Sequence, residues 1–223
     1  MRDSFTEPKD FTITRDIINV PAVKLSFLDN NIAYLQLLNF NENASAEFYQ
    51  AVNQIVNKKS PSLILDLRNN PGGYLDASVN IASYFLKKDD VVLREKDNTN
   101  REKLYYASDK KISLAGIPTV ILTNEGTASA AEILAGALRD NLNLKIIGEK
   151  SFGKGSVQTL LPLTDGSMIK ITIAEWFTPN GTAINEKGLE PDISVKLTED
   201  DWNDNKDPQL DKAKEIIKSL INQ

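Results

Sequence analysis

The chain has 223 residues, and its 26 Lys and Arg against 31 Asp and Glu give a formal net charge of −5 at pH 7. This length suits one large domain with a core of its own. The absence of cysteine and histidine excludes disulfides, thiolate nucleophiles and an imidazole base, and it leaves a zinc ion only carboxylates as ligands. For lack of these ligands we expect no metal, and we expect no cofactor. Because the charges form no basic stripe, we expect no nucleic-acid partner.

The N-terminal part of the chain gives little information on location. No apolar run approaches the ~20 residues that cross a bilayer, and the first residues lack the pattern of a signal peptide, so we expect no membrane contact by this chain. Residues 11–15 alternate like a strand that has little nearby to pair with. We therefore divide the chain into an N-terminal segment, 1–21, and one core domain, 22–223.

Hydrophobic periodicity predicts strands that alternate with helices. Apolar residues in short or alternating runs indicate strands, and apolar residues three or four apart indicate helices. Turn-forming residues join two strand pairs into hairpins, around Asp29-Asn30-Asn31 and around Thr164-Asp165-Gly166. In chain order we predict strands at 23–28 and 32–40, a helix at 48–56, a strand at 63–67, a helix at 75–85, a strand at 119–122, a helix from 129 to 138, strands at 144–148, 157–163 and 167–177, and a surface helix from 208.

This order of elements predicts an α/β fold with an added β-hairpin region and a C-terminal helix. The acidic stretch 200–207 is predicted to be a solvated connector. We find no internal repeat and no low-complexity stretch.

Ser129 opens a predicted helix and has two interpretations. Ser129 and Glu132 form the pattern of a capping box, which on its own is the more common meaning. A serine at a helix N-terminus also lies among free backbone N–H groups, which could stabilise an oxyanion formed there. The two roles are compatible, so Ser129 is a candidate nucleophile.

Lys154, between two glycines, is the candidate base in a chain without histidine. A lysine amine takes a proton from a hydroxyl only when it is uncharged, and desolvation favours that form. In an extended segment Lys154, Ser156 and Gln158 share a face, so the Gln158 amide could orient the amine. The simplest alternative is a solvated loop lysine.

Two further motifs overlap Lys154, and both are incomplete. Residues 148–154 match a phosphate-binding P-loop up to its lysine, but Gly155 stands where the hydroxyl residue belongs and strand-like residues follow. Residues 151–154 match the S-x-x-K of penicillin-binding enzymes without its companion motifs. We therefore expect no nucleotide binding.

The glycine loop 69–73 also has two interpretations. Such residues usually form a turn between a strand and a helix. Glycines also allow the backbone to approach a ligand closely, so the loop is a plausible donor of a second oxyanion N–H opposite that of Ala130.

Taken together, four ordered motifs resemble those of the carboxy-terminal processing peptidases, also called tail-specific proteases. The resemblance extends over most of residues 11–222. The motifs are Leu65-Asp66-Leu67-Arg68-Asn69-Asn70-Pro71-Gly72-Gly73, Gly126-Thr127-Ala128-Ser129-Ala130-Ala131-Glu132-Ile133-Leu134, Gly148-Glu149-Lys150-Ser151-Phe152-Gly153-Lys154-Gly155-Ser156-Val157-Gln158, and Thr178-Pro179-Asn180-Gly181 onward to Gly188-Leu189-Glu190-Pro191-Asp192-Ile193.

The resemblance implies a serine endopeptidase on a core related to the ClpP and crotonase fold, acting near the C-termini of protein or peptide substrates. It implies a Ser-Lys dyad and an acyl-enzyme. By motif position the nucleophile is Ser129, the base is Lys154 and the orienting amide is that of Gln158.

The resemblance also implies the supporting residues. The oxyanion donors would be Ala130 and one of Gly72 and Gly73. Glu132 and Asp140 match positions that are sensitive to change in the family, and we interpret them as supporting structure.

One departure from the family concerns its N-terminal part. Family members usually carry a peptide-binding PDZ domain before the core, and here only a segment like its closing strand, 11–15, is recognisable. The family also usually acts outside the cytoplasm, in the periplasm or cell envelope. The alternatives are a non-catalytic or latent member of the same fold that binds a peptide or a lipophile; the oligomeric state is open.

Overall fold

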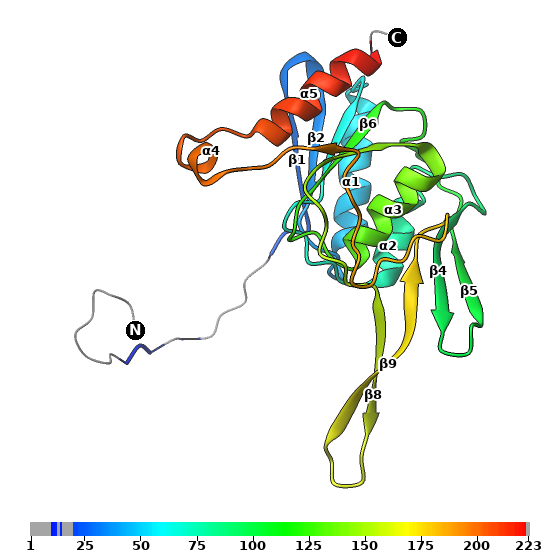
Figure 1. The fold of residues 1–223 in the computed structure, drawn as a ribbon. Helices are drawn as coiled ribbons and strands as arrows, with labels where there is room; N and C mark the ends of the chain where they lie inside the picture. The colour runs from blue at the N-terminus through cyan, green and yellow to red at the C-terminus, as the bar shows by residue number, and fades with distance from the viewer. Residues whose placement is uncertain (1–9, 13, 15–19, 222–223) are drawn as a thin grey trace.

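The computed structural model describes residues 10–12, 14 and 20–221. The centre of the fold is a six-stranded sheet (Figure 1). The strand order is β1-β2-β3-β6-β7-β10, and only the β1–β2 pair is antiparallel. These strands are β1 (Val23–Phe27), β2 (Ala33–Leu37), β3 (Leu63–Asp66), β6 (Thr119–Thr123), β7 (Lys145–Gly148) and β10 (Ile193–Ser194).

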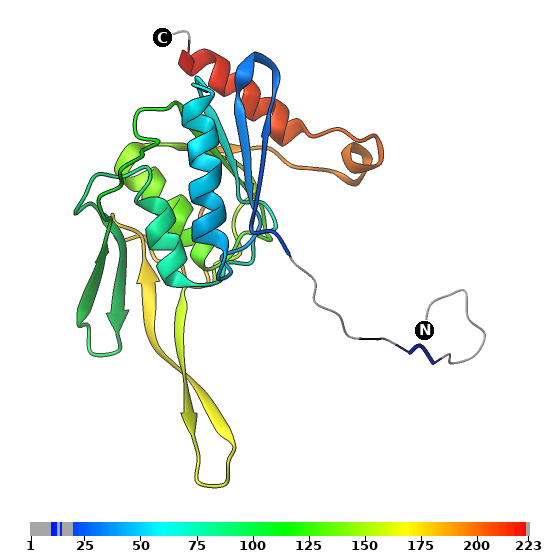
Figure 2. The same cartoon turned by 180° about the vertical axis from the view of Figure 1, so that it is seen from behind.

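Helices cover both faces of this sheet, as the two opposite views show (Figures 1 and 2). Three helices, α1 (Ala44–Asn57), α2 (Leu75–Ala82) and α3 (Ala130–Leu142), share one buried cluster, and α5 (Pro208–Ile221) belongs to a second one. The strand residues divide between the clusters with period two, as the alternation of side chains in a strand requires. A strand that is buried on both faces therefore has a continuous apolar sequence, as β3 and β6 do.

A second sheet, of order β5-β4-β9-β8, projects from the body (Figure 1). Its strands are β4 (Val91–Asp97), β5 (Glu102–Tyr106), β8 (Ser156–Pro162) and β9 (Met168–Phe177). All neighbours in this sheet are antiparallel, and β8 is an edge strand. The two remaining elements are the 3-10 turn η1 (Asp29–Asn31) and the short helix α4 (Glu199–Asn203).

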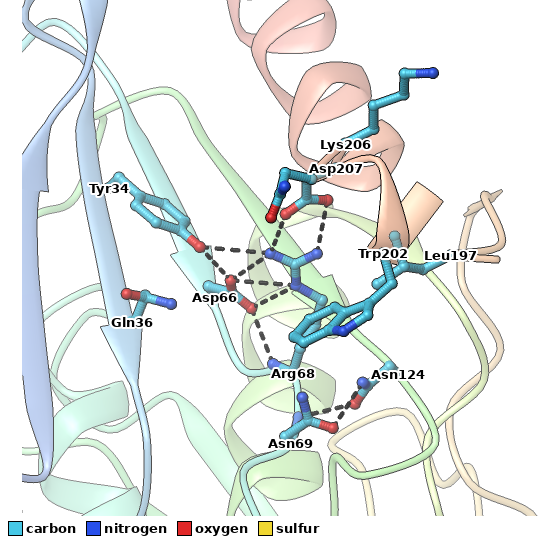
Figure 3. A pocket seen from close by; sticks show the side chains of 11 residues that line it. Tyr34, Gln36, Asp66, Arg68, Asn69, Asn124, Leu197, Trp202, Lys206 and Asp207 are labelled. Carbon is cyan, nitrogen blue, oxygen red and sulfur yellow. Dashed lines mark hydrogen bonds and ion pairs between the residues drawn. The ribbon is translucent and has the colours of Figure 1, made fainter. Parts of the chain in front are cut away.

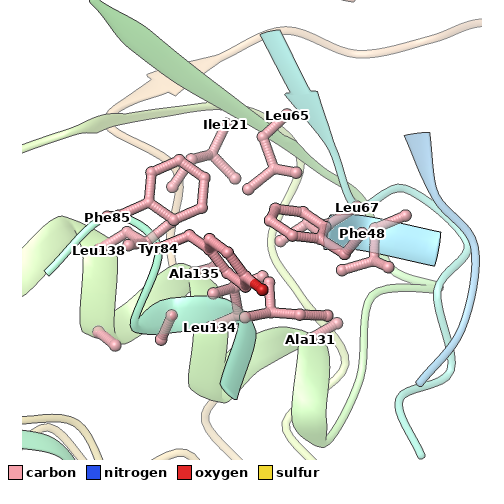
Figure 4. Packing of buried hydrophobic residues seen from close by; sticks show 14 of the residues in the cluster. Phe48, Leu65, Leu67, Tyr84, Phe85, Ile121, Ala131, Leu134, Ala135 and Leu138 are labelled. Carbon is pink, nitrogen blue, oxygen red and sulfur yellow. The ribbon is translucent and has the colours of Figure 1, made fainter. Parts of the chain in front are cut away.

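Aromatic side chains anchor the larger cluster (Figure 4). Phe48 of α1 is fully buried, and its ring centroid lies 5.6 Å from that of Tyr84 and 6.2 Å from that of Phe85. These tilted pairs join α1 to the turn that directly follows α2, so they help to hold the two helices over the sheet.

The structure confirms the α/β class, both predicted hairpins and the predicted helices, including the one from Pro208. The β4–β5 hairpin is not among the predicted elements, because its outer half is a run of charged residues without apolar alternation. The turn formers Asn98, Thr99 and Asn100 were the available signal for it.

The prediction of a solvated connector at 200–207 is wrong in two places. Residues up to Asn203 belong to α4, and Asp207 is only partly exposed because it pairs with Arg68. In the predicted strand at 11–15, Ile13 and Arg15 lie outside the described residues, and the other three residues belong to no helix or strand. No helix in the described ranges is long and apolar enough to cross a membrane.

We predict that Phe48→Ala lowers the free energy of unfolding by about 3–5 kcal/mol, because it leaves a cavity under two aromatic rings. Urea denaturation measures the change. Tyr49→Ala is the matched control on the same helix, since Tyr49 is 48% exposed and its loss should cost under about 1 kcal/mol. Equal losses in the two variants would contradict the assignment of Phe48 to the core.

Candidate active site

Ser129 is held in an unusual backbone conformation between β6 and α3. Its φ is 56° and its ψ is −119°, and it is the residue before the first turn of α3. Non-glycine residues seldom adopt this conformation, which costs roughly 1–3 kcal/mol and occurs most often at functional sites. The Ser129 side chain is mostly buried, with 8% exposed. Ser129 therefore lies in the turn between a strand and the helix that the sequence predicts it to open.

The glycine loop lies directly against Ser129. A Cβ placed on Gly72 would be 2.7 Å from Ser129 Cβ and 2.9 Å from Ala130 N, and the φ of Gly72 is +92°. No other residue fits there without displacing the serine. Asn70 is fully buried and joins the loop to the segment before Ser129, because its backbone oxygen accepts a hydrogen bond from Ala128 N–H at 2.9 Å.

The backbone N–H groups around Ser129 are not equivalent. Gly72 N–H donates to Asn70 Oδ1 at 2.9 Å. The N–H groups of Gly73 and Ala130 have no hydrogen-bond partner among the described residues. A free N–H on each of the two segments beside a candidate nucleophile is the arrangement that an oxyanion needs.

The Glu132 carboxylate links Ser129 to the loop that carries Lys154. Glu132 is fully buried in the first turn of α3, and four donors reach its two oxygens. Oε2 accepts hydrogen bonds from Ser129 N–H at 2.8 Å and Lys154 N–H at 2.9 Å. Oε1 accepts hydrogen bonds from Ser151 Oγ at 2.5 Å and Gly153 N–H at 2.7 Å.

This sharing fixes how far apart the two candidate catalytic residues are. Because the N–H groups of Ser129 and Lys154 contact the same oxygen, their nitrogen atoms are separated by at most roughly 6 Å. A lysine side chain can span such a distance. The backbone of the sequence-predicted dyad is thus brought together.

The Lys154 side chain, by contrast, is exposed, as is that of Gln158. Within the described part of the chain, no hydrogen bond joins Lys154 Nζ to Ser129 or to Gln158. The expectation of a desolvated amine is therefore not met in this conformation. The physical reason is local: Lys154 lies in the loop two residues before the edge strand β8, and Phe152 in the same loop is 67% exposed.

Asp140 lies at the opposite end of α3 from Ser129. It accepts a hydrogen bond from Asn180 N–H at 2.9 Å, and Arg139 Nε is 3.6 Å from its other oxygen. Ten residues of helix separate Asp140 from Ala130, about 15 Å. Asp140 thus bonds the Thr178–Gly181 motif at the far end of α3, and its supporting role in the reaction stays a prediction.

A polar network centred on Arg68 lies just before the glycine loop, and the sequence did not predict it (Figure 3). Arg68 Nη2 lies 2.7 Å from Asp66 Oδ2, and Arg68 Nη1 lies 2.9 Å from Asp207 Oδ1. A pocket of about 390 Å³ opens over these side chains. Burial opposes the charge of Arg68, but hydrogen bonds to the two carboxylates outweigh it and raise the arginine pKa.

We predict that Glu132→Gln lowers the free energy of unfolding by roughly 2–4 kcal/mol. An amide retains one acceptor oxygen and presents an NH₂ group to donors that now lose their acceptor, and buried donors without a partner are costly. Urea denaturation measures the loss. Glu125→Gln, an exposed change three residues before the bonded Ala128, should stay within about 0.5 kcal/mol of the wild type. A Glu132→Gln variant as stable as this control would show that the carboxylate does not hold the loop.

Known proteins of one family resemble this chain in sequence. The model of Peptidase family S41 matches residues 31–195. The chain is 39% identical over 189 residues to the carboxy-terminal processing protease CtpA of Bacillus subtilis, covering 84% of this chain and 40% of that protein. It is 38% identical over 193 residues to the carboxyl-terminal-processing protease of Synechocystis sp., covering 85% of this chain and 44% of that protein.

Solved structures give the same result. The photosystem II D1 C-terminal processing protease is similar with a TM-score of 0.74 and 34% identity, covering 82% of this chain and 50% of that one. The chain spans less than half the length of the two curated relatives. With a family match over most of its length and relatives at this identity, the chain belongs to peptidase family S41.

Proposed function

We propose that this chain is the catalytic core of a serine endopeptidase that cleaves protein substrates near their C-termini. The observation that carries the proposal is the pair of hydrogen bonds from Ser129 N–H and Lys154 N–H to one oxygen of Glu132. The names of the relatives, carboxy-terminal processing proteases, support the substrate class. By family resemblance we also propose that the whole protein acts outside the cytoplasm.

In the proposed mechanism, uncharged Lys154 accepts the Ser129 proton as Oγ attacks the peptide carbonyl carbon. The N–H groups of Ala130 and Gly73 donate to the oxyanion; we favour Gly73 over Gly72 because the Gly72 N–H is engaged by Asn70. Lys154 then protonates the leaving amine, and water hydrolyses the acyl-enzyme by the reverse proton path.

The exposed lysine amine must become desolvated for this chemistry. We propose that a bound substrate segment covers it, with Gln158 accepting a hydrogen bond from the amine to orient it. Binding of substrate would thereby supply the dry surroundings that favour the uncharged amine.

A second candidate function is that of a non-catalytic or latent peptide-binding member of the same fold. The exposed Lys154 side chain, which has no hydrogen bond to Ser129 among the described residues, is the observation that favours it. An unfolded protein incubated with the chain, followed by mapping of cleavage sites by mass spectrometry, distinguishes the two functions. Cleavage that Ser129→Ala abolishes supports the peptidase, and binding without cleavage supports the alternative.

We predict that Lys154→Ala lowers the rate of peptide cleavage by roughly 10³-fold or more, because the base is lost. Its melting temperature should stay close to that of the wild type, since the side chain is exposed. Lys150→Ala is the matched control: Lys150 lies in the same loop and pairs with Glu190, both largely exposed. It should cleave at the wild-type rate.

The two catalytic roles have separate tests. Reaction of Ser129 with a fluorophosphonate probe should disappear in Ser129→Ala, and probe labelling at another residue would refute the nucleophile. Cleavage by Lys154→Ala within tenfold of the wild type would refute the base. Equal losses in Lys150→Ala and Lys154→Ala would attribute the effect to the loop's charge instead.

A further inference from the structure

The side chain of Gln209 is fully buried although it lies in the first turn of α5. Its amide contacts three separate segments. Nε2 donates to Val195 O at 2.8 Å and to Glu149 Oε2 at 3.2 Å, and Oε1 accepts a hydrogen bond from Arg68 Nη1 at 3.0 Å. A buried amide with all its groups engaged is costly to disturb, because any group left unpaired stays desolvated.

One of these contacts reaches the root of the glycine loop. Arg68 lies two residues after the end of β3 and directly precedes the loop at 69–73. Asp207 holds the same guanidinium through two hydrogen bonds of 2.9 Å, and its Oδ1 also accepts a hydrogen bond from Leu210 N–H in α5 at 2.9 Å. Two side chains therefore hold Arg68 at the start of α5: Asp207, the residue before the helix, and Gln209 in its first turn.

The charge of Asp207 is favoured where it lies. Burial alone would raise the pKa of its carboxyl, but the hydrogen bonds from Arg68 and Leu210 and the Arg68 charge lower the pKa below its ordinary value. Asp207 is thus ionised at neutral pH and available as the partner of the guanidinium.

A second contact, with Glu149, lies at the start of the loop 149–155 that carries Lys154 (the lysine loop). Glu149 immediately follows β7, and both its backbone groups are bonded to Thr123 at the end of β6, at 3.0 and 2.9 Å. Ser151, two residues later, donates to Glu132. The amide of Gln209 is the only side chain in the described part of the chain that bonds both Arg68 and Glu149.

We propose that Gln209 is a positioning residue. Through it, α5 keeps Arg68, just before the glycine loop, and Glu149, at the start of the lysine loop, in fixed relative positions. The inference rests on the proposed endopeptidase function. Gln209 contacts neither Ser129 nor Lys154, and α5 packs on the sheet face opposite α3. Gln209 acts by hydrogen-bonding Arg68 and Glu149. Its loss therefore alters the relative positions of the two loops around Ser129 and Lys154, and leaves the residues that bind the substrate unchanged.

We predict that Gln209→Met lowers kcat for peptide cleavage by about 10–100-fold while KM changes less than about threefold. Methionine has a similar length but makes no hydrogen bond to Arg68 or Glu149, and losses of this size follow when a supporting contact of a reacting group is removed. Initial rates over a range of peptide concentrations, taken well below the melting temperature, measure both constants.

Ile217→Ala is the matched control. Ile217 is also fully buried in α5, but it packs only in the apolar cluster on that face. The control should have a lower melting temperature than the wild type, because it leaves a buried cavity, with kcat within about twofold of the wild type. A kcat for Gln209→Met no lower than that of Ile217→Ala would overturn the proposal.

A readout without catalysis separates the proposal from the proposed function. Amide hydrogen exchange at residues 69–73 and 151–155 should be faster in Gln209→Met than in Ile217→Ala, and equal rates would overturn the proposal. If the wild type neither cleaves peptide nor reacts with the fluorophosphonate probe, the endopeptidase function fails, whatever the exchange rates. Should Gln209→Met not fold, Glu149→Ala tests the same link, because it removes only the partly buried acceptor; it should also lower kcat, and an unchanged kcat would overturn the proposal.

Discussion

The buried carboxylate of Glu132 is the interaction on which the site depends. Removing a charge from water costs several kcal/mol, and among the described residues no cation pairs with this one. Four donors compensate instead, and a hydrogen bond to a charged group contributes roughly 1.5–3 kcal/mol. The carboxylate can remain buried only if all four donors stay in place. The fold thereby ties the nucleophile's backbone to the lysine loop.

The parallel sheet explains why three loops distant in sequence meet around Ser129. The glycine loop follows β3, the Ser129 segment follows β6, and the lysine loop follows β7. These strands are neighbours and run parallel, so their carboxyl ends lie at the same edge of the sheet. Ligand sites in open α/β sheets lie at this edge. The contacts of Gln209 with Arg68 and Glu149 come from the same alignment, because α5 begins over the ends of β3 and β7.

The sequence predicts the parts of this arrangement that are local. Apolar periodicity is sufficient for β3, β6 and α3, and the glycines of the motifs mark loops that approach Ser129 closely. Contacts such as Arg68–Gln209 join residues 141 apart, and an acidic stretch gives no sign that Asp207 will be partly buried. Exposure of Lys154 depends on what covers the edge of β8, which no local pattern specifies. Long-range polar pairing is therefore the part that the sequence could not supply.

The contrast between the backbone and the side chain of Lys154 suggests how the proposed dyad forms. The Lys154 N–H is bonded to the same Glu132 oxygen as the Ser129 N–H, so the two backbones are already close. In the proposed dyad, rotation about the lysine side-chain bonds brings the amine to Ser129, and ordering a lysine side chain costs only up to about 2 kcal/mol. Removing the proton from an exposed ammonium group is the larger obstacle, because water stabilises the charged form. The step that must be coupled to substrate binding is consequently desolvation, since the backbone geometry exists before the substrate arrives.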